Sequence, residues 1–221
     1  MTKHVLHHNT IGVVLAGGQS RRMGQNKALL ARNTPEPVLA QNIQQSMLYF
    51  TCQQIVKAGV TQLVINGAAD TYSDLLIEQI ALHLAVPVIR VNDDEVAQGP
   101  IGGIASVLTH TTVKTDSRYI FVPVDLPLLQ DLDLAQLIQG GCVNQRAAHF
   151  EQQPLPLFIY DVASGQKALE QQRLKNDRSV WCLASLLHAF TLLPAEPSNW
   201  LNANTPQEWA EAQALINPAA D

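Results

Sequence analysis

Short apolar runs alternate along this chain with longer segments whose apolar residues recur every three or four positions. Runs of four to eight apolar residues predict buried strands, and the longer period predicts helices. The predicted strands are 11–16, 62–66, 87–91, 119–124, 155–160 and 190–193. The predicted helices after the first are 71–85, 102–109, 131–139, 163–172, 179–189 and one that starts at 205–206. Strands separated by helices predict right-handed crossovers and a three-layer α/β/α fold with a mostly parallel central sheet.

Three helix predictions depend on particular residues. The first helix is expected after Pro35 and Pro37 and should stop near Gly59. Its apolar positions have the spacing i, i+4, i+8: Leu39, Ile43 and Met47. The helix over 71–85 should bury one side, formed by Leu75, Leu76, Ile80 and Leu84. For the last helix, Thr205 and Glu208 have the spacing of a capping box.

Composition narrows the class of protein. A chain of 221 residues with 47% hydrophobic residues is predicted to fold as one domain over 1–221, with 1–9 as a flexible tail. A net charge of −5 gives no reason to expect nucleic-acid binding. No apolar stretch reaches about 18 residues, and the N-terminus lacks the apolar centre of a secretory signal, so no membrane association is expected. Three widely spaced cysteines, Cys52, Cys142 and Cys182, indicate a reducing compartment and a cytoplasmic protein.

A glycine-rich segment follows the first predicted strand. Gly17 and Gly18 end the apolar run, and cations and a third glycine come next: Arg21, Arg22, Gly24 and Lys27. Such a loop lets backbone N–H groups approach an anion while the cations neutralise it. It is not the common ATPase loop, because Met23 stands where that motif needs glycine. A plain strand-to-helix turn is the alternative interpretation.

Polar side chains also follow the other predicted strands. They are Asn66, Asp93 and Asp94, Asp125, and the late pair Asn202 and Asn204. Ligands of open parallel sheets bind at the carboxyl ends of the strands, so these residues are expected at one edge. Asp125 stands between Pro123 and Pro127 and is the best candidate to hold Mg²⁺, although it could instead cap a turn. Taken singly, each of the others could also be a turn residue.

These residues resemble those of the nucleotidyltransferase superfamily of sugar-nucleotide and cofactor pyrophosphorylases. Within it, the chain is most similar to the molybdenum cofactor guanylyltransferases, the MobA-like nucleotidyltransferases. The similar segments are 15–27, 99–103, 123–127 and 202–206, in the family's order. Gly18 favours the guanine-using branch, because the cytidylyl relatives usually have alanine there. The resemblance implies a Rossmann-like nucleotidyltransferase fold.

The resemblance also implies an activity: transfer of GMP from Mg-GTP to the terminal phosphate of molybdopterin, with release of pyrophosphate. The guanine and ribose side of GTP would be bound by Leu15, Ala16, Gly17 and Gly18. The guanosine would be recognised by Asn66 and by one of Asp93 or Asp94. The catalytic residues would be Arg22 and Lys27, which would hold the triphosphate, and Asp125, which would bind Mg²⁺. Asn202 or Asn204 would complete the metal site. Asp177, Arg178 and Ser179 match a weaker pattern for the pterin side.

Partners implied in the same way are GTP, molybdopterin, and proteins of cofactor synthesis and molybdoenzyme maturation. The chain departs from the family pattern at 34–37, where Thr-Pro-Glu-Pro replaces the common Gly-Lys-Pro, and before Pro154, where a basic residue is usual. A cytidylyl or sugar-phosphate transferase remains an alternative. So does a non-catalytic nucleotide-binding or cofactor-carrier protein, although the presence of both Lys27 and Asp125 argues against it.

Overall fold

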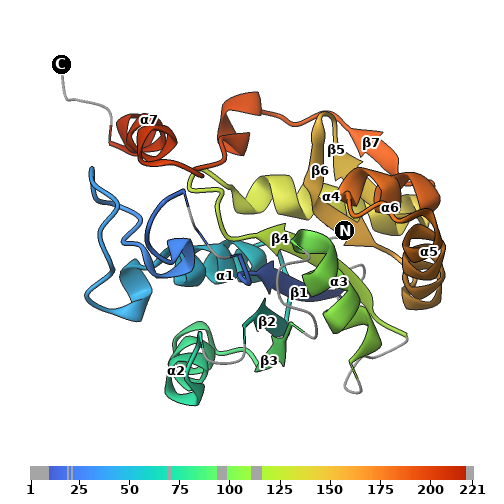
Figure 1. The fold of residues 1–221 in the computed structure, drawn as a ribbon, viewed down its shortest axis with the longest axis horizontal. Coiled ribbons are helices and arrows are strands. Elements are labelled where there is room, and N and C mark those ends of the chain that lie inside the picture. Colours follow the sequence, from blue (N-terminus) through green and yellow to red (C-terminus); the bar gives the residue numbers. More distant parts are fainter. Residues whose placement is uncertain are drawn as a thin grey trace, which may run out of the picture.

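One seven-stranded sheet organises the protein (Figure 1). The structure, a computed structural model, describes residues 10–18, 20, 22–68, 71–93, 99–110 and 116–217. The strand order is β3-β2-β1-β4-β6-β5-β7. The strands are β1 (Thr10–Leu15), β2 (Leu63–Gly67), β3 (Val88–Asn92), β4 (Arg118–Pro123), β5 (Ala148–Phe150), β6 (Gln153–Ile159) and β7 (Phe190–Leu192). Four of the strand pairings are parallel, and the two that involve β6 are antiparallel, which confirms the mostly parallel sheet.

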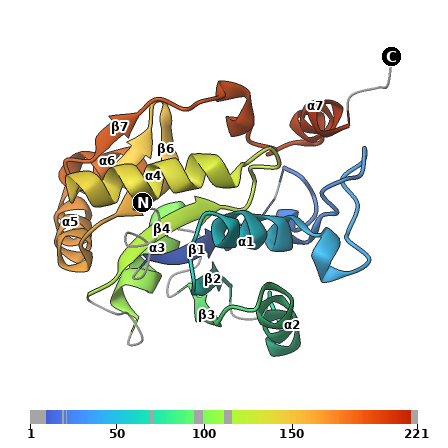
Figure 2. The same ribbon diagram turned by 180° about the vertical axis from the view of Figure 1, so that it is seen from behind.

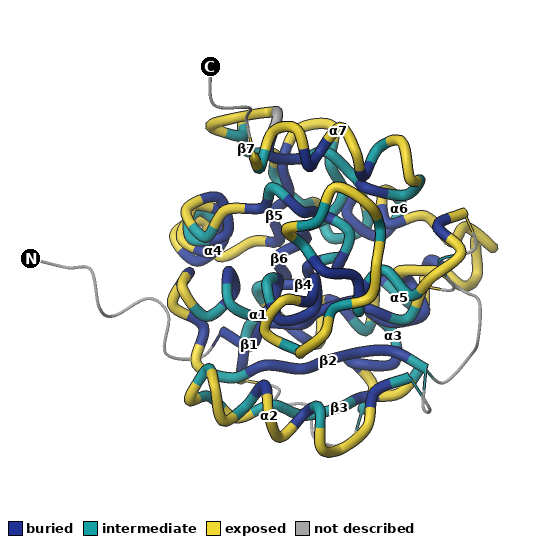
Figure 3. Tube along the Cα trace, turned by 90° about the vertical axis from the view of Figure 1, so that its left-hand side faces the viewer, coloured by how far each residue is buried: buried dark blue, intermediate teal, exposed yellow. Residues whose placement is uncertain are grey.

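Helices cover both faces of this sheet. They are α1 (Met47–Lys57), α2 (Asp74–Leu84), α3 (Pro100–Thr109), α4 (Asp131–Asn144), α5 (Val162–Lys175), α6 (Val180–Leu186) and α7 (Pro206–Ile216). Helices α1, α2 and α4 share one core cluster with Val14 and Val122, whereas α3, α5 and α6 share a second cluster with Val13 and Phe121. Neighbouring residues of one strand thus face opposite cores, as the alternation of side chains along a strand requires. Views from the two sides show these two helix layers (Figures 1 and 2), and the strands between them are largely buried (Figure 3).

The predicted start of the first helix is wrong. Residues 30–46 form an irregular loop held by the isolated bridges Leu30–Leu39 and Ala31–Ser46, with a short 3₁₀ turn, η2, at Ile43–Gln45. Helix α1 begins only at Met47, where the Ser46 hydroxyl accepts a hydrogen bond from the Tyr49 N–H at 3.1 Å. The side-chain cap decides the boundary, and the apparent helical spacing before it is coincidental.

Two further differences concern burial and length. Three of the four residues predicted on the apolar side of α2, Leu76, Ile80 and Leu84, pack against the core, whereas Leu75 is 65% exposed and Ile77 is buried in its place. Strand β5 was not predicted, because three buried residues are too short a run to stand out. The capping box at the start of α7 is confirmed. In the described part of the chain, we find no helix both long and apolar enough to cross a membrane.

Helix α7 stands apart from the sheet and packs beside the 30–46 loop (Figures 1 and 2). The Trp209 indole N–H donates to the carbonyl of Thr34 at 3.0 Å, and the Gln213 amide donates to the carbonyl of Arg32 at 2.5 Å. Trp209 is fully buried in this contact. The C-terminal helix is therefore fixed against the loop that leads away from the glycine-rich segment.

Candidate active site

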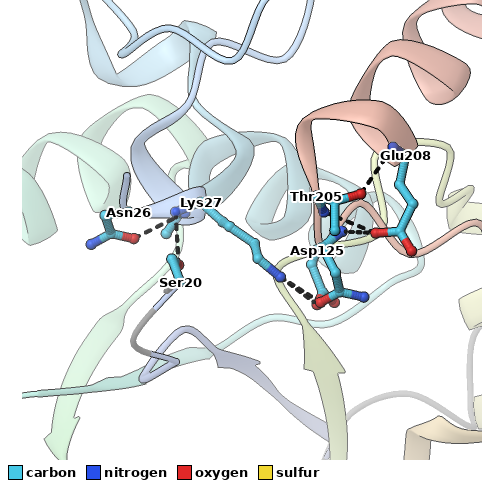
Figure 4. Close-up of polar contacts among 8 residues, drawn as sticks. Ser20, Asn26, Lys27, Asp125, Thr205 and Glu208 are labelled. Carbon is cyan, nitrogen blue, oxygen red and sulfur yellow. Dashed lines mark hydrogen bonds and ion pairs between the residues drawn. The ribbon is translucent and has the colours of Figure 1, made fainter. Parts of the chain in front are cut away.

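Lys27 begins a short 3₁₀ turn, η1 (Lys27–Leu29), directly after the glycine-rich segment. The Asn26 side chain caps this turn by accepting from the Ala28 N–H at 3.0 Å. The Lys27 N–H donates to the Ser20 hydroxyl at 3.1 Å (Figure 4). The loop is thus closed on itself, and the Lys27 side chain points out of it toward Asp125.

The ammonium of Lys27 joins three distant segments. It lies 3.3 Å from an Asp125 carboxylate oxygen and donates to the Asn204 side-chain oxygen at 2.6 Å. The side chains of Lys27 and Asp125 are 13% and 22% exposed, so both groups are partly desolvated. Partial burial strengthens this ion pair relative to one in open water.

Asp125 is held by its neighbours on the chain and across the sheet. The Val124 N–H donates to the Leu15 carbonyl at 3.2 Å, and the Ala203 N–H donates to the Asp125 carbonyl at 3.0 Å. These bonds tie the loop after β4 to the end of β1 and to the segment before α7. The carboxylate therefore has a defined position at the carboxyl edge of the sheet.

Arg32 contacts the same loop after β4. Its Nε–H donates to the Pro127 carbonyl at 2.9 Å, and its guanidinium lies 3.8 Å from the centre of the Phe50 ring. Burial lowers the pKa of Arg32, because the charged form loses hydration. Sequence reasoning did not select Arg32, since a single arginine in a loop carries no pattern.

Glu208 closes the start of α7 beside this group. One of its carboxylate oxygens accepts from the Asn204 and Thr205 N–H groups, both at 2.8 Å, and its own N–H donates to the Thr205 hydroxyl (Figure 4). The bond from the Asn204 N–H is the main cause that lowers the pKa of Glu208, and the charge of Arg22 lowers it further. Arg22 itself is exposed. The capping box was predicted from the sequence, but its contact with the candidate site was not.

Gly17 and Gly18 differ in their surroundings. A Cβ atom at Gly17 would lie 2.1 Å from an Asp93 carboxylate oxygen, whereas one at Gly18 would meet nothing within 4 Å. Asp93 is fixed by its N–H, which donates to the Gly67 carbonyl at 3.0 Å. The Asp93 carboxylate therefore lies directly against the backbone of Gly17, and space is open above Gly18. Asp94 is outside the residues that the structure describes.

Tyr72 supports this part of the site from within. It is 1% exposed, and its hydroxyl donates to the Ala16 carbonyl at 2.9 Å. Its ring packs so close to Gly67 that a Cβ there would come within 2.7 Å. Burial is the main cause that raises the pKa of Tyr72, and the nearby Asp93 charge adds to it. Tyr72 was missed because a lone aromatic residue before a helix has no distinctive spacing.

Asn66 lies in the interior and not at the open edge. It is 1% exposed, and its amide donates to the Val91 carbonyl at 3.2 Å. A Cβ atom at Gly103 of α3 would come within 2.2 Å of the Asn66 side-chain oxygen. The contacts of Asn66 thus connect β2, β3 and α3, and a contact with guanosine stays a prediction. Leu15 and Ala16 are also buried, so mainly their backbone groups are available to a ligand at the carboxyl edge of the sheet.

The predicted metal residues are only partly brought together. Among the described residues, no three histidine, cysteine, aspartate or glutamate side chains form a group that could hold a metal ion. The oxygen of Asn204 faces the Lys27 ammonium, and Asn202 is half-buried two positions earlier. Of the three predicted metal residues, Asp125 is the one with a carboxylate, and in the structure this carboxylate pairs with the Lys27 ammonium. One carboxylate suits Mg²⁺, which takes its remaining ligands from phosphates and water.

The residues predicted for the pterin side, 177–179, form a turn between α5 and α6. The Ser179 N–H donates to the Asp177 carboxylate at 2.7 Å, and the Gln172 amide donates to the Ser179 carbonyl at 2.7 Å. The Ser179 hydroxyl caps α6 through the Cys182 N–H. These contacts show a capping role, and contact with a pterin stays a prediction.

Comparison with known proteins places this chain in a family. Residues 12–189 match the model of the MobA-like NTP transferase domain. The chain is 33% identical to a molybdenum cofactor guanylyltransferase of Xanthomonas euvesicatoria pv. vesicatoria, over 90% of this chain and 92% of that protein. It is 28% identical to one of Vibrio cholerae, over 94% and 93%. A nucleotidyl transferase structure from Methanothermobacter thermautotroptrophicus shares the fold, with a TM-score of 0.66 at 16% identity over 96% of this chain and all of that one. This chain is a nucleotidyltransferase that belongs to the MobA-like NTP transferase family.

Proposed function

We propose that the protein transfers GMP from GTP to the terminal phosphate of molybdopterin, forming the guanine dinucleotide cofactor and pyrophosphate. One observation carries the proposal: Lys27, Asp125 and Asn204 meet at the edge where β1 ends and where space is open above Gly18. Relatives that align over about nine-tenths of this chain are named molybdenum cofactor guanylyltransferases. These names indicate transfer of a guanylyl group to the molybdenum cofactor. At the edge of the sheet, Lys27 and Asp125 are groups suited to bind a nucleoside triphosphate and its Mg²⁺.

Positioning and charge neutralisation account for the chemistry we propose. Lys27 and Arg22 bind the triphosphate and offset the charge that develops on the leaving pyrophosphate. Asp125 holds Mg²⁺, which when bound neutralises phosphate charge and aligns the reacting groups. The attacking phosphate monoester is already anionic at neutral pH, so no side chain has to remove a proton from it. Asn204 accepts a hydrogen bond from the Lys27 ammonium and so helps to hold it in place.

Guanine selection follows from the groups around Gly17. The guanine ring N–H and exocyclic amine need acceptors, and the Asp93 carboxylate against Gly17 is suited to receive them. The open space above Gly18 leaves room for the nucleotide to approach the backbone. A site with buried acceptors rejects bases that lack matching donors, because its own polar groups would then stay unpaired.

We also propose that the chain works as one domain in the cytoplasm and passes its product to proteins of molybdoenzyme maturation. Support for a reducing compartment comes from Cys52, Cys142 and Cys182, none of which forms a disulfide bond in the structure. Residues of the matched segment 12–189 and of the segment beyond it meet at one site, which supports a single functional unit.

The test is pyrophosphate release from GTP, CTP, ATP or UTP with Mg²⁺, with and without molybdopterin, alongside the thermal shift that each nucleotide causes. We expect release only with GTP and molybdopterin together, and the largest rise in melting temperature with GTP. Equal release with CTP would contradict the choice of guanine. A thermal shift with GTP but no pyrophosphate with any acceptor would indicate a binding protein.

A further inference from the structure

The Glu208 carboxylate does more than cap its own helix. In a capping box, the carboxylate at the third helical position accepts from the N–H of the cap residue. Here the cap residue is Thr205, and the same oxygen also accepts from the Asn204 N–H, one position further out. Glu208 therefore fixes the backbone of a residue that lies outside the helix.

Asn204 is the residue whose side chain holds Lys27. Its oxygen accepts from the Lys27 ammonium at 2.6 Å, which is shorter than the 3.3 Å between Lys27 and Asp125. The Ala203 N–H also bonds the Asp125 carbonyl, so the backbone of 203–204 is held at both ends. A shift of this backbone would move the acceptor that faces the ammonium.

We propose that Glu208 is a positioning residue that, through the Asn204 backbone, fixes the Lys27 ammonium beside Asp125. Glu208 lies outside residues 12–189, so the inference concerns a segment beyond the matched domain. The importance of Lys27 for GMP transfer rests on the proposed function, but its positioning by Glu208 does not.

The capping box offers its own control. Thr205→Ala removes the hydroxyl that accepts from the Glu208 N–H, whereas Glu208→Ala removes the acceptor of the Asn204 N–H. Both variants weaken the same cap, at a cost of about 1 kcal/mol each. Asp161→Ala removes a carboxylate cap from α5, where Asp161 accepts from the Ser164 N–H at 2.8 Å. A role in the stability of α7 alone would make Glu208→Ala and Thr205→Ala behave alike, and Asp161→Ala controls for the loss of a helix cap elsewhere in the fold.

The experiment measures how fast acetic anhydride acetylates Lys27 in the ligand-free full chain, by peptide mass spectrometry. The exposed Lys167 serves as an internal reference. In Glu208→Ala, we expect Lys27 to react about fivefold faster than in the unmodified protein, the change that loss of one hydrogen bond would cause. Thr205→Ala and Asp161→Ala should leave the rate unchanged. Glu208→Gln keeps an oxygen acceptor without the charge and should lie between, so it gives the test if Glu208→Ala does not fold.

Turnover provides the second readout. Glu208→Ala should lower kcat/KM for GTP about tenfold, while Asp161→Ala leaves it unchanged and Glu208→Gln recovers part of the loss. Faster Lys27 acetylation in Glu208→Ala, together with no GTP turnover by the unmodified protein, would count against the proposed function and not against the positioning. Equal Lys27 acetylation in the unmodified protein, Glu208→Ala and Glu208→Gln would overturn the positioning role, as would an equal increase in Thr205→Ala.

Discussion

The ammonium of Lys27 lies 3.3 Å from the carboxylate of Asp125, although 98 residues separate them in the chain. Lys27 comes from the turn after β1, and Asp125 from the loop after β4, which is the neighbour of β1 in the sheet. Parallel pairing of these two strands puts both loops at one edge. A cation and an anion are thus preformed side by side where a triphosphate and its Mg²⁺ would need both.

Asp125→Asn tests the carboxylate. The substitution keeps the shape and removes the charge, so we expect turnover to fall by about 10²–10³-fold while the fold persists. Pyrophosphate release at saturating Mg²⁺, together with the circular dichroism spectrum, measures both. Near-normal turnover at low Mg²⁺ concentration would contradict the metal-binding role.

Lys27→Ala tests the phosphate contact. Loss of a charge-assisted hydrogen bond should weaken GTP binding about tenfold or more. The two side chains are only 13% and 22% exposed, and loss of the ammonium leaves Asp125 and Asn204 without their partner, so the free energy of unfolding should fall by about 1–3 kcal/mol. Calorimetric titration of GTP and chemical denaturation measure the two effects, with Lys167→Ala as the control for loss of an exposed lysine. A large loss of stability with unchanged GTP affinity would show that Lys27 is structural.

Gly17→Ala and Gly18→Ala form a matched pair. A methyl group at Gly17 would collide with Asp93, so we expect a cost of about 1–3 kcal/mol in the free energy of unfolding and a reduced preference for GTP. A methyl group at Gly18 meets open space in the ligand-free protein, so stability should hardly change. Any effect of Gly18→Ala should appear only in the ratio of kcat/KM between GTP and CTP. The same loss of stability in both variants would contradict the different surroundings of the two glycines.

Asp133→Asn tests a buried carboxyl away from the site. Burial raises the pKa of Asp133, although the hydrogen bond from Asn199 opposes the shift. The folded protein therefore binds this proton more tightly than the unfolded chain does, and at neutral pH the charged group opposes folding. We expect Asp133→Asn to raise the free energy of unfolding at pH 7, and the gain to shrink as the pH falls toward 3.8, the ordinary pKa of the group.

Urea denaturation between pH 3.5 and pH 7.5 measures this dependence. Asp161→Asn is a control of opposite sign, because its hydrogen bonds with Ser164 lower the pKa of Asp161. That carboxylate stabilises the fold above its ordinary pKa, and the benefit disappears as the pH falls through the lowered value. A stability difference for Asp133→Asn that does not vary with pH would show that the charge of Asp133 is not its cause.

Local patterns predicted the elements with the strongest signals. The apolar runs that correspond to β1 and β4 stood out because strands in the centre of a sheet with helices on both faces are buried on both sides and are therefore mostly apolar. The start of α1 could not be predicted in the same way, since 39–46 keeps a helical spacing but is held open by the bridges at Leu30 and Ala31. Those bridges join residues whose pairing depends on the rest of the fold.

The residues of the candidate site likewise fall into those that the sequence predicted and those that it did not. Lys27 and Asp125 were predicted because glycines, prolines and strand ends mark them in the sequence. Tyr72 and Arg32 were not, because their contacts are with backbone carbonyls of Ala16 and Pro127, which any sequence offers.

The sequence by itself determined the fold class and the family, and it predicted that Lys27 and Asp125 lie at one edge of the sheet. The fold class follows from the periodicity of apolar residues, and the family follows from short motifs whose residues are close together in the chain. Only the tertiary structure decided which group faces which: that Asn66 turns inward to Val91, and that Asn204 faces Lys27. The physical reason is distance along the chain. A hydrogen bond between residues 177 apart exists only after the strand order is set and α7 has docked on the loop at 32–34.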